Sequence, residues 1–403
     1  MLDQMKKTIS SEMAIVMTIM AFGVLAMSVL QPMLPLYLTS IGVTPALLGL
    51  MLSVAMVGMV IGESSWGWVA DKIGAKIPLS AGTFVCALAV FFFVLTQNVP
   101  LIFTIFFFWG LVRSALFGPG RGYIGAKAPP LRKATFMAII AVMMSASRSI
   151  GALPSGFVAD NWGFHAVFFI SCGISLLGGI VVVAGLRKTQ PLKYESTTVT
   201  SPPSDELPLP VQTLSYQPLT LQCVVTALQF LGLGALMSFL PLLATQVVGV
   251  TATEVGILFT IRGLSTMVLG IPMGMMADWK GKRIFMTLGL LVSGAAMAGI
   301  AFTENFPWLI VFTIVSSLGL TMFSPAALGL VSDSVPLHLQ STAMGVYGGM
   351  CENTGIIAGA SLGGFVWSAW GPRATFLMGT VAAIVGAVIC FFGLVRGRAS
   401  KNL

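Results

Sequence analysis

Five charged residues stand inside long apolar segments: Glu63, Arg113, Arg148, Arg262 and Glu352. The segments around them run for roughly 20 residues or more, the length of a helix that crosses a ~30 Å hydrocarbon layer. A charge near the middle of such a layer costs at least ~2.5–3.5 kcal/mol, so such side chains mark solute paths, proton paths or buried ion pairs. Two acids and three bases allow partial pairing. The chemistry they suit is reversible protonation or the binding of a charged solute.

The composition places these charges in a membrane protein. Of the 403 residues, 56% are hydrophobic and 8% are charged, whereas a soluble globular protein has about 25% charged residues. The first apolar segment is too long for a signal peptide and lacks a small-residue cleavage site, so we predict a membrane helix there. The five cysteines are dispersed in apolar segments, which gives neither a disulfide framework nor metal-ligand spacing.

Apolar runs between polar breaks predict an all-α integral membrane fold with twelve spans. Seventeen of the 21 Lys and Arg residues fall on one side of this arrangement, one falls on the other side, and three lie within spans. Positive loops face the cytoplasm, so we expect both termini to be cytoplasmic in a multi-pass protein of the inner (plasma) membrane. The net charge of +8 is then a topological signal that needs no nucleic-acid partner. The predicted spans are residues 12–38, 45–69, 77–97, 100–122, 134–158, 165–186, 218–244, 253–276, 284–302, 306–330, 341–367 and 373–395.

A polar segment at residues 187–217 interrupts the series of spans. It mixes Pro, Ser, Thr and charge without helical periodicity, as in SPPSDELP at 201–208. That composition predicts a flexible cytoplasmic linker. It divides the chain into residues 1–186 and residues 218–403, each with six spans.

The two halves repeat the same sequence phrases in the same order. GWVADKIGAK at 67–76 is matched by GMMADWKGKR at 274–283, IGVTPALLG at 41–49 by VGVTATEVG at 248–256, and WGFHAVF at 162–168 by WGPRATF at 370–376. Pro35 likewise matches Pro241. Ordered matches imply one six-helix unit duplicated in tandem, and the even number of spans gives both copies the same orientation.

The first repeated phrase resembles the signature loop of the major facilitator superfamily, roughly G-x-x-x-D-x-x-G-x-[RK]. The resemblance covers essentially the whole chain and implies a transporter whose two six-helix bundles rock about a central site. The signature loops would then latch the cytoplasmic side, with the two aspartates as gating residues; the alternative is that these aspartates only cap helices and guide topology. The residues that fill the motif are Gly67, Asp71, Gly74 and Lys76 in the first half and Gly274, Asp278, Gly281 and Arg283 in the second.

The resemblance also implies how the intramembrane charges meet. In this superfamily the second and eleventh helices adjoin, as do the fifth and eighth. Glu63 and Glu352 are therefore expected in one seam, and Arg148 and Arg262 in the other. Two neighbouring carboxylates away from bulk water resist ionising together, which is what a proton-coupling site needs. The alternative for these charges is that they only hold helices together or reach the headgroups.

Two further features resemble the proton antiporters of the superfamily. Arg113 matches their intramembrane Arg on the fourth helix, although Phe117 stands where their motif has Gly. Gly151-Ala-Leu-Pro-Ser-Gly156 departs from their G-P-x-x-G-G run on the fifth helix. The resemblance implies an antiporter, and these departures weaken that assignment.

The spans that would line the central site carry few hydrogen-bonding side chains, among them Gln31 and Gln229. A sugar site needs many such groups, because unpaired buried hydroxyls are penalised. The 24 Met and 27 Phe residues suit an adaptable apolar pocket, although most of them are expected to face lipid or pack helices.

We therefore predict proton-coupled export of small lipophilic or amphiphilic compounds by alternating access. The expected partners are a small-molecule substrate and the lipid bilayer, the expected form is a monomer, and neither a cofactor beyond the proton gradient nor a metal nor catalysis is expected. Two alternatives stay open: a carrier of an organic anion or other metabolite, whose carboxylate the arginines would bind, and a lipid flippase or non-transporting receptor.

Overall fold

The structure, a computed structural model, describes residues 11–127, 133–186, 217–334 and 347–399, and its elements are all helical. The predicted linker lies outside the described residues, apart from Gln217, which begins α9. The elements are α2 (Ser11–Leu30), α3 (Leu34–Ser40), α4 (Pro45–Ile73), α5 (Lys76–Leu95), α6 (Val99–Arg113), η1 (Ser114–Leu116), α7 (Gly118–Lys127), α8 (Lys133–Gly185), α9 (Gln217–Leu243), η3 (Ala244–Val248), α10 (Ala252–Lys280), α11 (Lys282–Phe302), α12 (Phe306–Ser334), η5 (Tyr347–Glu352), α14 (Asn353–Trp370) and α15 (Pro372–Ala399).

These helices account for the twelve predicted crossings. Ten helical segments of the described chain are long and apolar enough to span a membrane. One of them, Val142–Gly185, has 44 residues and contains two helices that meet at Gly163, where φ is 78°. Counting it twice and adding α14, an 18-residue helix rich in Gly and Ser, gives twelve. The predicted fold class is confirmed.

Turn glycines show the duplication at the level of the backbone. Only glycine adopts a positive φ without strain, and the six residues with positive φ in the described chain are all glycines. They form three pairs at the spacing of the sequence repeat: Gly42 (φ 87°) with Gly249 (78°), Gly74 (87°) with Gly281 (103°), and Gly163 (78°) with Gly371 (86°). Each half therefore makes its short turns in the same way.

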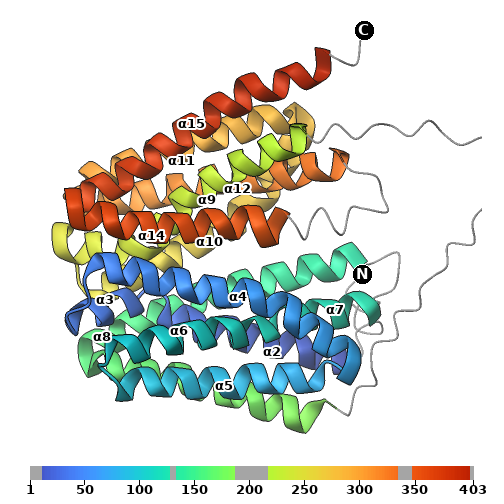
Figure 1. The fold of residues 1–403 in the computed structure, drawn as a ribbon, viewed down its shortest axis with the longest axis vertical. Helices are drawn as coiled ribbons and strands as arrows, with labels where there is room; N and C mark the ends of the chain where they lie inside the picture. Colours follow the sequence, from blue (N-terminus) through green and yellow to red (C-terminus); the bar gives the residue numbers. More distant parts are fainter. Residues whose placement is uncertain (1–10, 128–132, 187–216, 335–346, 400–403) are drawn as a thin grey trace, which may run out of the picture.

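The helices gather into two bundles, with α2 to α8 in one and α9 to α15 in the other (Figure 1). Their apolar cores join at one end only. There, one buried cluster contains side chains from both bundles, such as Phe93, Trp109, Phe239 and Trp367. Towards the opposite end, each bundle has a separate buried cluster of its own. The bundles are thus fused at one end and independent at the other.

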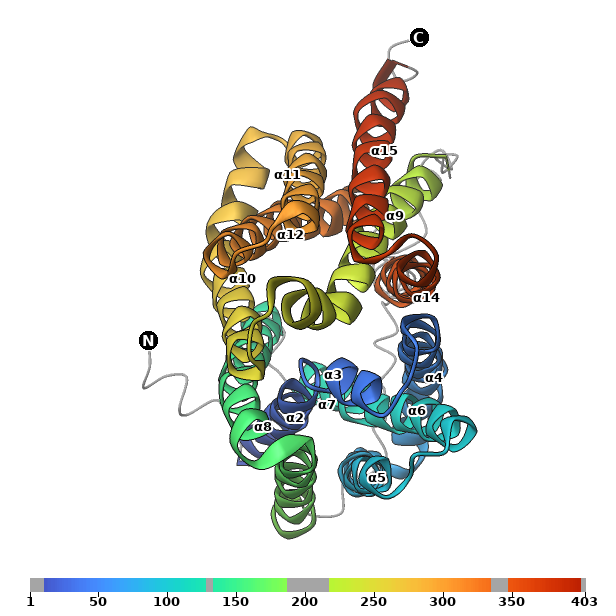
Figure 2. The same ribbon diagram turned by 90° about the vertical axis from the view of Figure 1, so that its left-hand side faces the viewer.

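Two seams of glycine close the fused end, where α4 lies beside α14 and α8 beside α10 (Figure 2). A Cβ on Gly49 of α4 would lie 2.2 Å from the carbonyl oxygen of Ala360, and a Cβ on Gly156 of α8 would lie 2.1 Å from that of Ala252. The absence of a side chain lets the two backbones touch, as at other close helix crossings in membranes. Both seams depend on these glycines.

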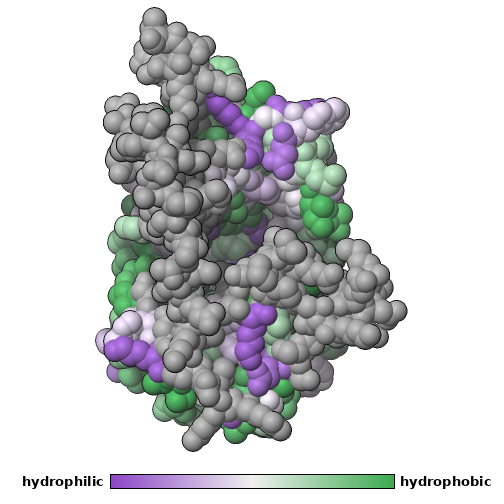
Figure 3. Space-filling model, turned by 90° about the vertical axis from the view of Figure 1, so that its right-hand side faces the viewer, coloured by the Kyte–Doolittle hydropathy of each residue, from purple (hydrophilic) through white to green (hydrophobic). Residues whose placement is uncertain are grey.

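At the other end the bundles diverge, and at this end α2 begins and α15 ends (Figure 1). Figure 3 looks onto it and shows a hollow between the two bundles, with both polar and apolar residues at its depth. The structure therefore has the shape expected of one state of a rocking transporter: it is closed at the end with the turns at Gly42, Gly163, Gly249 and Gly371, and open at the end with the turns at Gly74 and Gly281.

A cysteine pair tests the closed end directly. In the α4–α14 seam, Ser361 Oγ donates to Ser53 Oγ at 2.6 Å, close enough for a disulfide after Ser53→Cys and Ser361→Cys. We expect a mild oxidant to crosslink the double variant and a reductant to reverse the crosslink. The measurement is a gel of protein cut by a protease between the two halves: the crosslinked halves run together, and the halves that are not crosslinked run separately. The two single variants are the controls. Failure of the double variant to crosslink in membranes would contradict this packing.

Candidate functional site

Arg113 is buried inside the first bundle and is surrounded by sulfur and aromatic groups. Its side chain is 4% exposed. Its Nη1 and Nη2 donate to the Sδ atoms of Met27 and Met59, each at 2.8 Å, and its guanidinium carbon lies 4.8 Å from the ring centroid of Trp109. Nε has no hydrogen-bond partner among the described residues. These neighbours are neutral, so they hold the guanidinium in place without cancelling its charge.

A break in the helix presents this residue to a cavity. The α-helical ladder of α6 ends at Arg113, and the 3-10 turn η1 follows. Pro119 lacks the N–H that would bond to the carbonyl of Ala115, so the ladder cannot continue. Short 3-10 turns inside a helix often occur at hinges and functional sites. The cavity beside Arg113 lies among α2, α5, α6, η1 and α8, and holds about 380 Å³ of empty space including its mouth.

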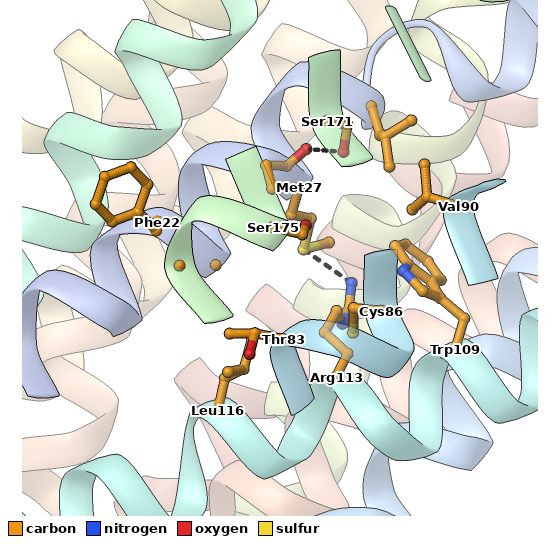
Figure 4. A pocket seen from close by; sticks show the side chains of 14 residues that line it. Phe22, Met27, Thr83, Cys86, Val90, Trp109, Arg113, Leu116, Ser171 and Ser175 are labelled. Atoms are coloured by element: carbon orange, nitrogen blue, oxygen red, sulfur yellow. Dashed lines mark hydrogen bonds between the residues drawn. The ribbon is translucent and has the colours of Figure 1, made fainter. Parts of the chain in front are cut away.

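The cavity wall is mostly apolar, as the close-up in Figure 4 shows. Phe22, Val90 and Leu116 line it together with Trp109. Two of its hydroxyl groups already have partners within the bundle: Thr83 Oγ1 donates to the carbonyl of Ser80 at 2.9 Å, and Ser171 Oγ donates to the carbonyl of Ala26 at 2.8 Å. The wall therefore combines apolar side chains with one guanidinium and few other hydrogen-bonding groups.

Two charged residues act on the Arg113 guanidinium from outside the cavity wall. Glu63 attracts it and Arg148 repels it. Glu63 is half-buried on α4, and Arg148 is exposed on α8. The chain segments that carry Glu63 and Arg113 pack against each other, since a Cβ on Gly62 would lie 2.2 Å from Ser114 Oγ.

Glu63 and Glu352 occupy matching depths on the helices of one seam. The expected contact of the second and eleventh helices is present, with Ser53 on Ser361. Glu63 is ten residues and Glu352 nine residues from this contact, about 15 Å and 14 Å along their helices. Both lie towards the open end, where the helices diverge, and Glu352 ends the π-helical turn η5. The two acids therefore stand on opposite walls of the opening.

Arg148 and Arg262 occupy different surroundings, although their helices pack together as expected. Arg148 is exposed, whereas Arg262 is 7% exposed and lines a second cavity inside the other bundle. Gln229 lines that same cavity.

Gln31 lies at the midline between the bundles, where its Nε2 donates to Met237 Sδ at 3.3 Å. Gln31 and Met237 occupy corresponding positions in the repeat, since Pro35 follows Gln31 by four residues and Pro241 follows Met237 by four residues.

The signature loops hold the third and sixth helices of each half together. Lys76 Nζ donates to the carbonyls of Val183 and Leu186. In the second half, Arg283 makes the equivalent bonds to the carbonyls of Cys390 and Phe391. Val183 lies in the last turn of α8, where a cation on the carbonyl groups is favourable. The basic motif residues therefore act within each bundle.

The aspartates of these loops lie at the open end. The carboxylate of Asp278 is 76% exposed, 4.0 Å from Lys282 Nζ; the side chain of Asp71 lies outside the described residues. Gly74 and Gly281 make the positive-φ turns, while Gly67 and Gly274 have no backbone neighbour close enough to exclude a side chain. Gating by these loops remains a prediction.

Asp160 is a contact between the halves that the sequence did not reveal. Its carboxylate accepts from the backbone N–H groups of Ala252 (3.1 Å) and Thr253 (2.8 Å) at the start of α10. Thr251 and Glu254 already form a capping box on the same helix, so Asp160 of α8 takes two of the remaining N–H groups. The signal that could have suggested it is an acid placed before the turn at Gly163. Elsewhere in the described chain, no three His, Cys, Asp or Glu side chains gather closely enough to hold a metal ion.

Removing this carboxylate should favour opening of the closed end. We expect Asp160→Ala to cost the closed state about 1 kcal/mol, because two helix N–H groups lose their partner. The measurement is the distance distribution between spin labels placed on α8 and α10 at that end. Asn161→Ala is the control, since the Asn161 amide bonds only within its own helix. An unchanged distribution in Asp160→Ala would disprove the latch.

Arg113 should be dispensable for folding and required for transport. Replacing a buried charge by an apolar side chain of similar length is often neutral for stability, so we expect Arg113→Met to unfold near the wild-type temperature while transport falls at least about tenfold. Lysine should not rescue transport, because an ammonium cannot reach both sulfurs and the ring together. Thr83→Val, in the same cavity, is the control. Wild-type transport by Arg113→Met would contradict this role.

Comparisons with known proteins agree with this architecture. The sequence profile of the Major Facilitator Superfamily matches the chain twice, over residues 16–222 and 222–403. The Multidrug resistance protein MdtG of Enterobacter lignolyticus (strain SCF1) is 24% identical over 396 residues, covering 92% of this chain and 89% of that protein. The Quinolone resistance protein NorA of Staphylococcus aureus is 30% identical over 137 residues, 34% of this chain and 35% of NorA.

Solved structures share the fold. A mutant form of the nucleoside transporter NupG superposes with a TM-score of 0.78 at 13% identity, covering 94% of this chain and 98% of that chain. A bacterial homologue of the human lysosomal transporter Spinster, inward-facing and occupied, gives 0.75 at 13% identity, with coverage of 94% and 95%. These proteins are transporters and not enzymes. The predicted resemblance is confirmed: the chain belongs to the major facilitator superfamily of membrane transporters.

Proposed function

We propose that this transporter exports small lipophilic or amphiphilic compounds in exchange for protons, by alternating access across the inner (plasma) membrane. Its full-length similarity to a multidrug resistance protein supports the substrate class. We further propose that residues 1–186 and 218–403 move as two bundles joined by the linker 187–217. One chain contains both walls of the path, so a monomer suffices.

The distribution of positive charge supports the orientation. The open end carries Lys72, Lys76, Lys280 and Arg283, whereas Arg373 lies at the closed end and pairs with Glu304. Under the positive-inside rule the open end faces the cytoplasm. The structure then corresponds to an inward-facing state, ready to receive substrate from the cytoplasm or the inner leaflet.

The proximity of Glu63 and Arg113 is the observation that carries the proposed coupling. While Glu63 is ionised, it attracts the guanidinium, whose direct contacts are neutral. When Glu63 takes a proton, that attraction ends and the repulsion from Arg148 remains. The position of Arg113 beside α4 is then less stable. Because Arg113 precedes a break in its helix, a shift of its side chain can be passed to α7.

Glu352 provides a second acid on the opposite wall. It is the last residue of the π-helical turn η5, in which Tyr347 is buried and its hydroxyl accepts from Thr226 Oγ1 at 3.2 Å. Glu63 and Glu352 would approach each other when the open end closes, because they lie at matching depths on α4 and α14. Two carboxylates brought together resist joint ionisation, so closure of this end would favour the protonated form. Proton binding and bundle movement are coupled in this way.

Proteoliposomes with an imposed pH gradient test the proposal. We expect wild-type protein to move lipophilic cations and neutral amphiphiles from a substrate panel against their gradients. Glu63→Gln and Glu352→Gln should each reduce gradient-driven flux at least about tenfold, while counterflow without a gradient persists, because only the coupling is removed. Glu304→Gln, at the closed end, is the control. Gradient-driven flux that survives both substitutions would disprove the coupling.

A carrier of organic anions is the second candidate, favoured by the buried guanidinium group of Arg113. The same panel distinguishes it: an organic anion would be the transported solute, and Arg113→Met would raise its KM rather than abolish coupling. Flux of a fluorescent phospholipid alone would instead favour a lipid flippase.

A further inference from the structure

The second bundle encloses a cavity that corresponds to the Arg113 cavity of the first. Ser293, Ser316 and Leu320 line it at positions 207 residues beyond Cys86, Trp109 and Arg113. The repeat therefore places Leu320 where the first half has its arginine. The second cavity nevertheless contains a guanidinium, which comes from Arg262 on a different helix, α10. Duplication therefore does not explain why the second cavity contains an arginine.

Arg262 is held in the cavity by the packing of its helix. On α10, Thr260 Oγ1 donates to the carbonyl of Ser149 at 3.2 Å, and Gly263 packs against Ser149. These contacts turn one face of α10 towards α8. Arg262 lies about 200° around the helix from Thr260, so its side chain points into the second bundle. There it is 7% exposed.

The charge of Arg262 is uncompensated by the described residues. Its Nη1 is buried and has no hydrogen-bond partner there. The charged group that acts on it is Arg148, which repels it. An unpaired buried charge costs several kcal/mol. Unlike Arg113, which has two sulfur atoms, an aromatic ring and Glu63, Arg262 lacks a described acid to offset this cost.

Gln229 supplies a second unsatisfied group in the same cavity. Its side chain is 5% exposed, its Nε2 donates to Ser293 Oγ at 2.9 Å, and its Oε1 has no partner among the described residues. The two ends of an amide are interchangeable by a half-turn. After that turn Oε1 accepts from the Ser293 hydroxyl, and Nε2 points into the cavity as a donor. Guanidinium and amide donors then face the same space.

The cavity is small. Its empty space of about 310 Å³ includes the open mouth, so the enclosed part is smaller than that. Such a space suits a halide or another small anion beside the Arg262 side chain.

We propose that the second bundle contains a binding site for a small inorganic monoanion, with chloride as its physiological occupant, held by Arg262, Gln229 and the hydroxyl of Ser316. The site lies within one bundle and away from the path between the bundles. The inference does not rest on the transported substrate or on proton coupling. Its expected effect is to stabilise the second bundle, and with it the seam between α8 and α10.

Bromide diffraction locates the site without any variant. Crystals of the full-length protein grown in bromide should show an anomalous peak within hydrogen-bond distance of Arg262 and Gln229. A cavity that contains water alone, without bromide signal, would overturn the proposal.

Thermal unfolding in detergent provides a solution test. At constant ionic strength, replacing gluconate by chloride or bromide should raise the unfolding temperature of the wild-type protein by about 2–4 °C, because the halide binds only the folded state. Gluconate is too large for the cavity and keeps general screening equal. Arg262→Met should lose the halide dependence, and Gln229→Leu should weaken it.

Arg373→Gln is the matched control, since it removes a positive charge from the exposed closed end and should keep the full halide dependence. Equal halide effects in wild type and Arg262→Met would overturn the site. If Arg262→Met does not fold, Gln229→Leu and the bromide peak decide the question.

Discussion

Contact between backbones at four glycines is the constraint on which the rest of the structure depends. Gly49 and Gly364 close the seam of α4 with α14, and Gly156 and Gly256 close the seam of α8 with α10. A side chain at any of them would meet a carbonyl group of the facing helix at under 3 Å. The sequence repeat relates Gly49 to Gly256 and Gly156 to Gly364, so the duplicated unit carries one half of each seam. The two copies of the duplicated bundle can therefore pack together at one end and close it.

The two buried arginines follow from the same geometry. Helices that touch at glycines direct their large side chains away from the seam and into the bundles, where α10 places Arg262. Arg113 reaches its cavity by a different route, because Pro119 ends the hydrogen-bond ladder of its helix. The bundles are not interchangeable, although their backbones repeat: one guanidinium has sulfur, aromatic and acidic neighbours, and the other faces a small polar cavity.

Much of the fold was predictable, because each signal is local in the sequence. Lipid requires long apolar helices, turns require glycines such as Gly74 and Gly281, and a tandem repeat requires matching phrases. The residues that carry unusual chemistry were also visible, since Glu63, Arg113 and Glu352 are conspicuous in apolar surroundings. Their partners were not. The sulfur atoms of Met27 and Met59 belong to a common residue type, and nothing in the sequence marks two methionines as ligands of a guanidinium.

The sequence by itself determined the membrane setting, the number of crossings, the duplication and the family, because hydrophobic length, charge and repeated spacing do not depend on how helices pack. Only the tertiary structure decided which end is closed, that Asp160 caps a helix of the other bundle, and that Arg148 is exposed while Arg262 is buried. These features depend on contacts between residues that lie from 92 to 308 positions apart, such as Asp160 with Ala252 and Ser53 with Ser361, and on the rotation of each helix about its axis. Such a rotation is set by packing against the neighbouring helix, which no stretch of sequence specifies alone.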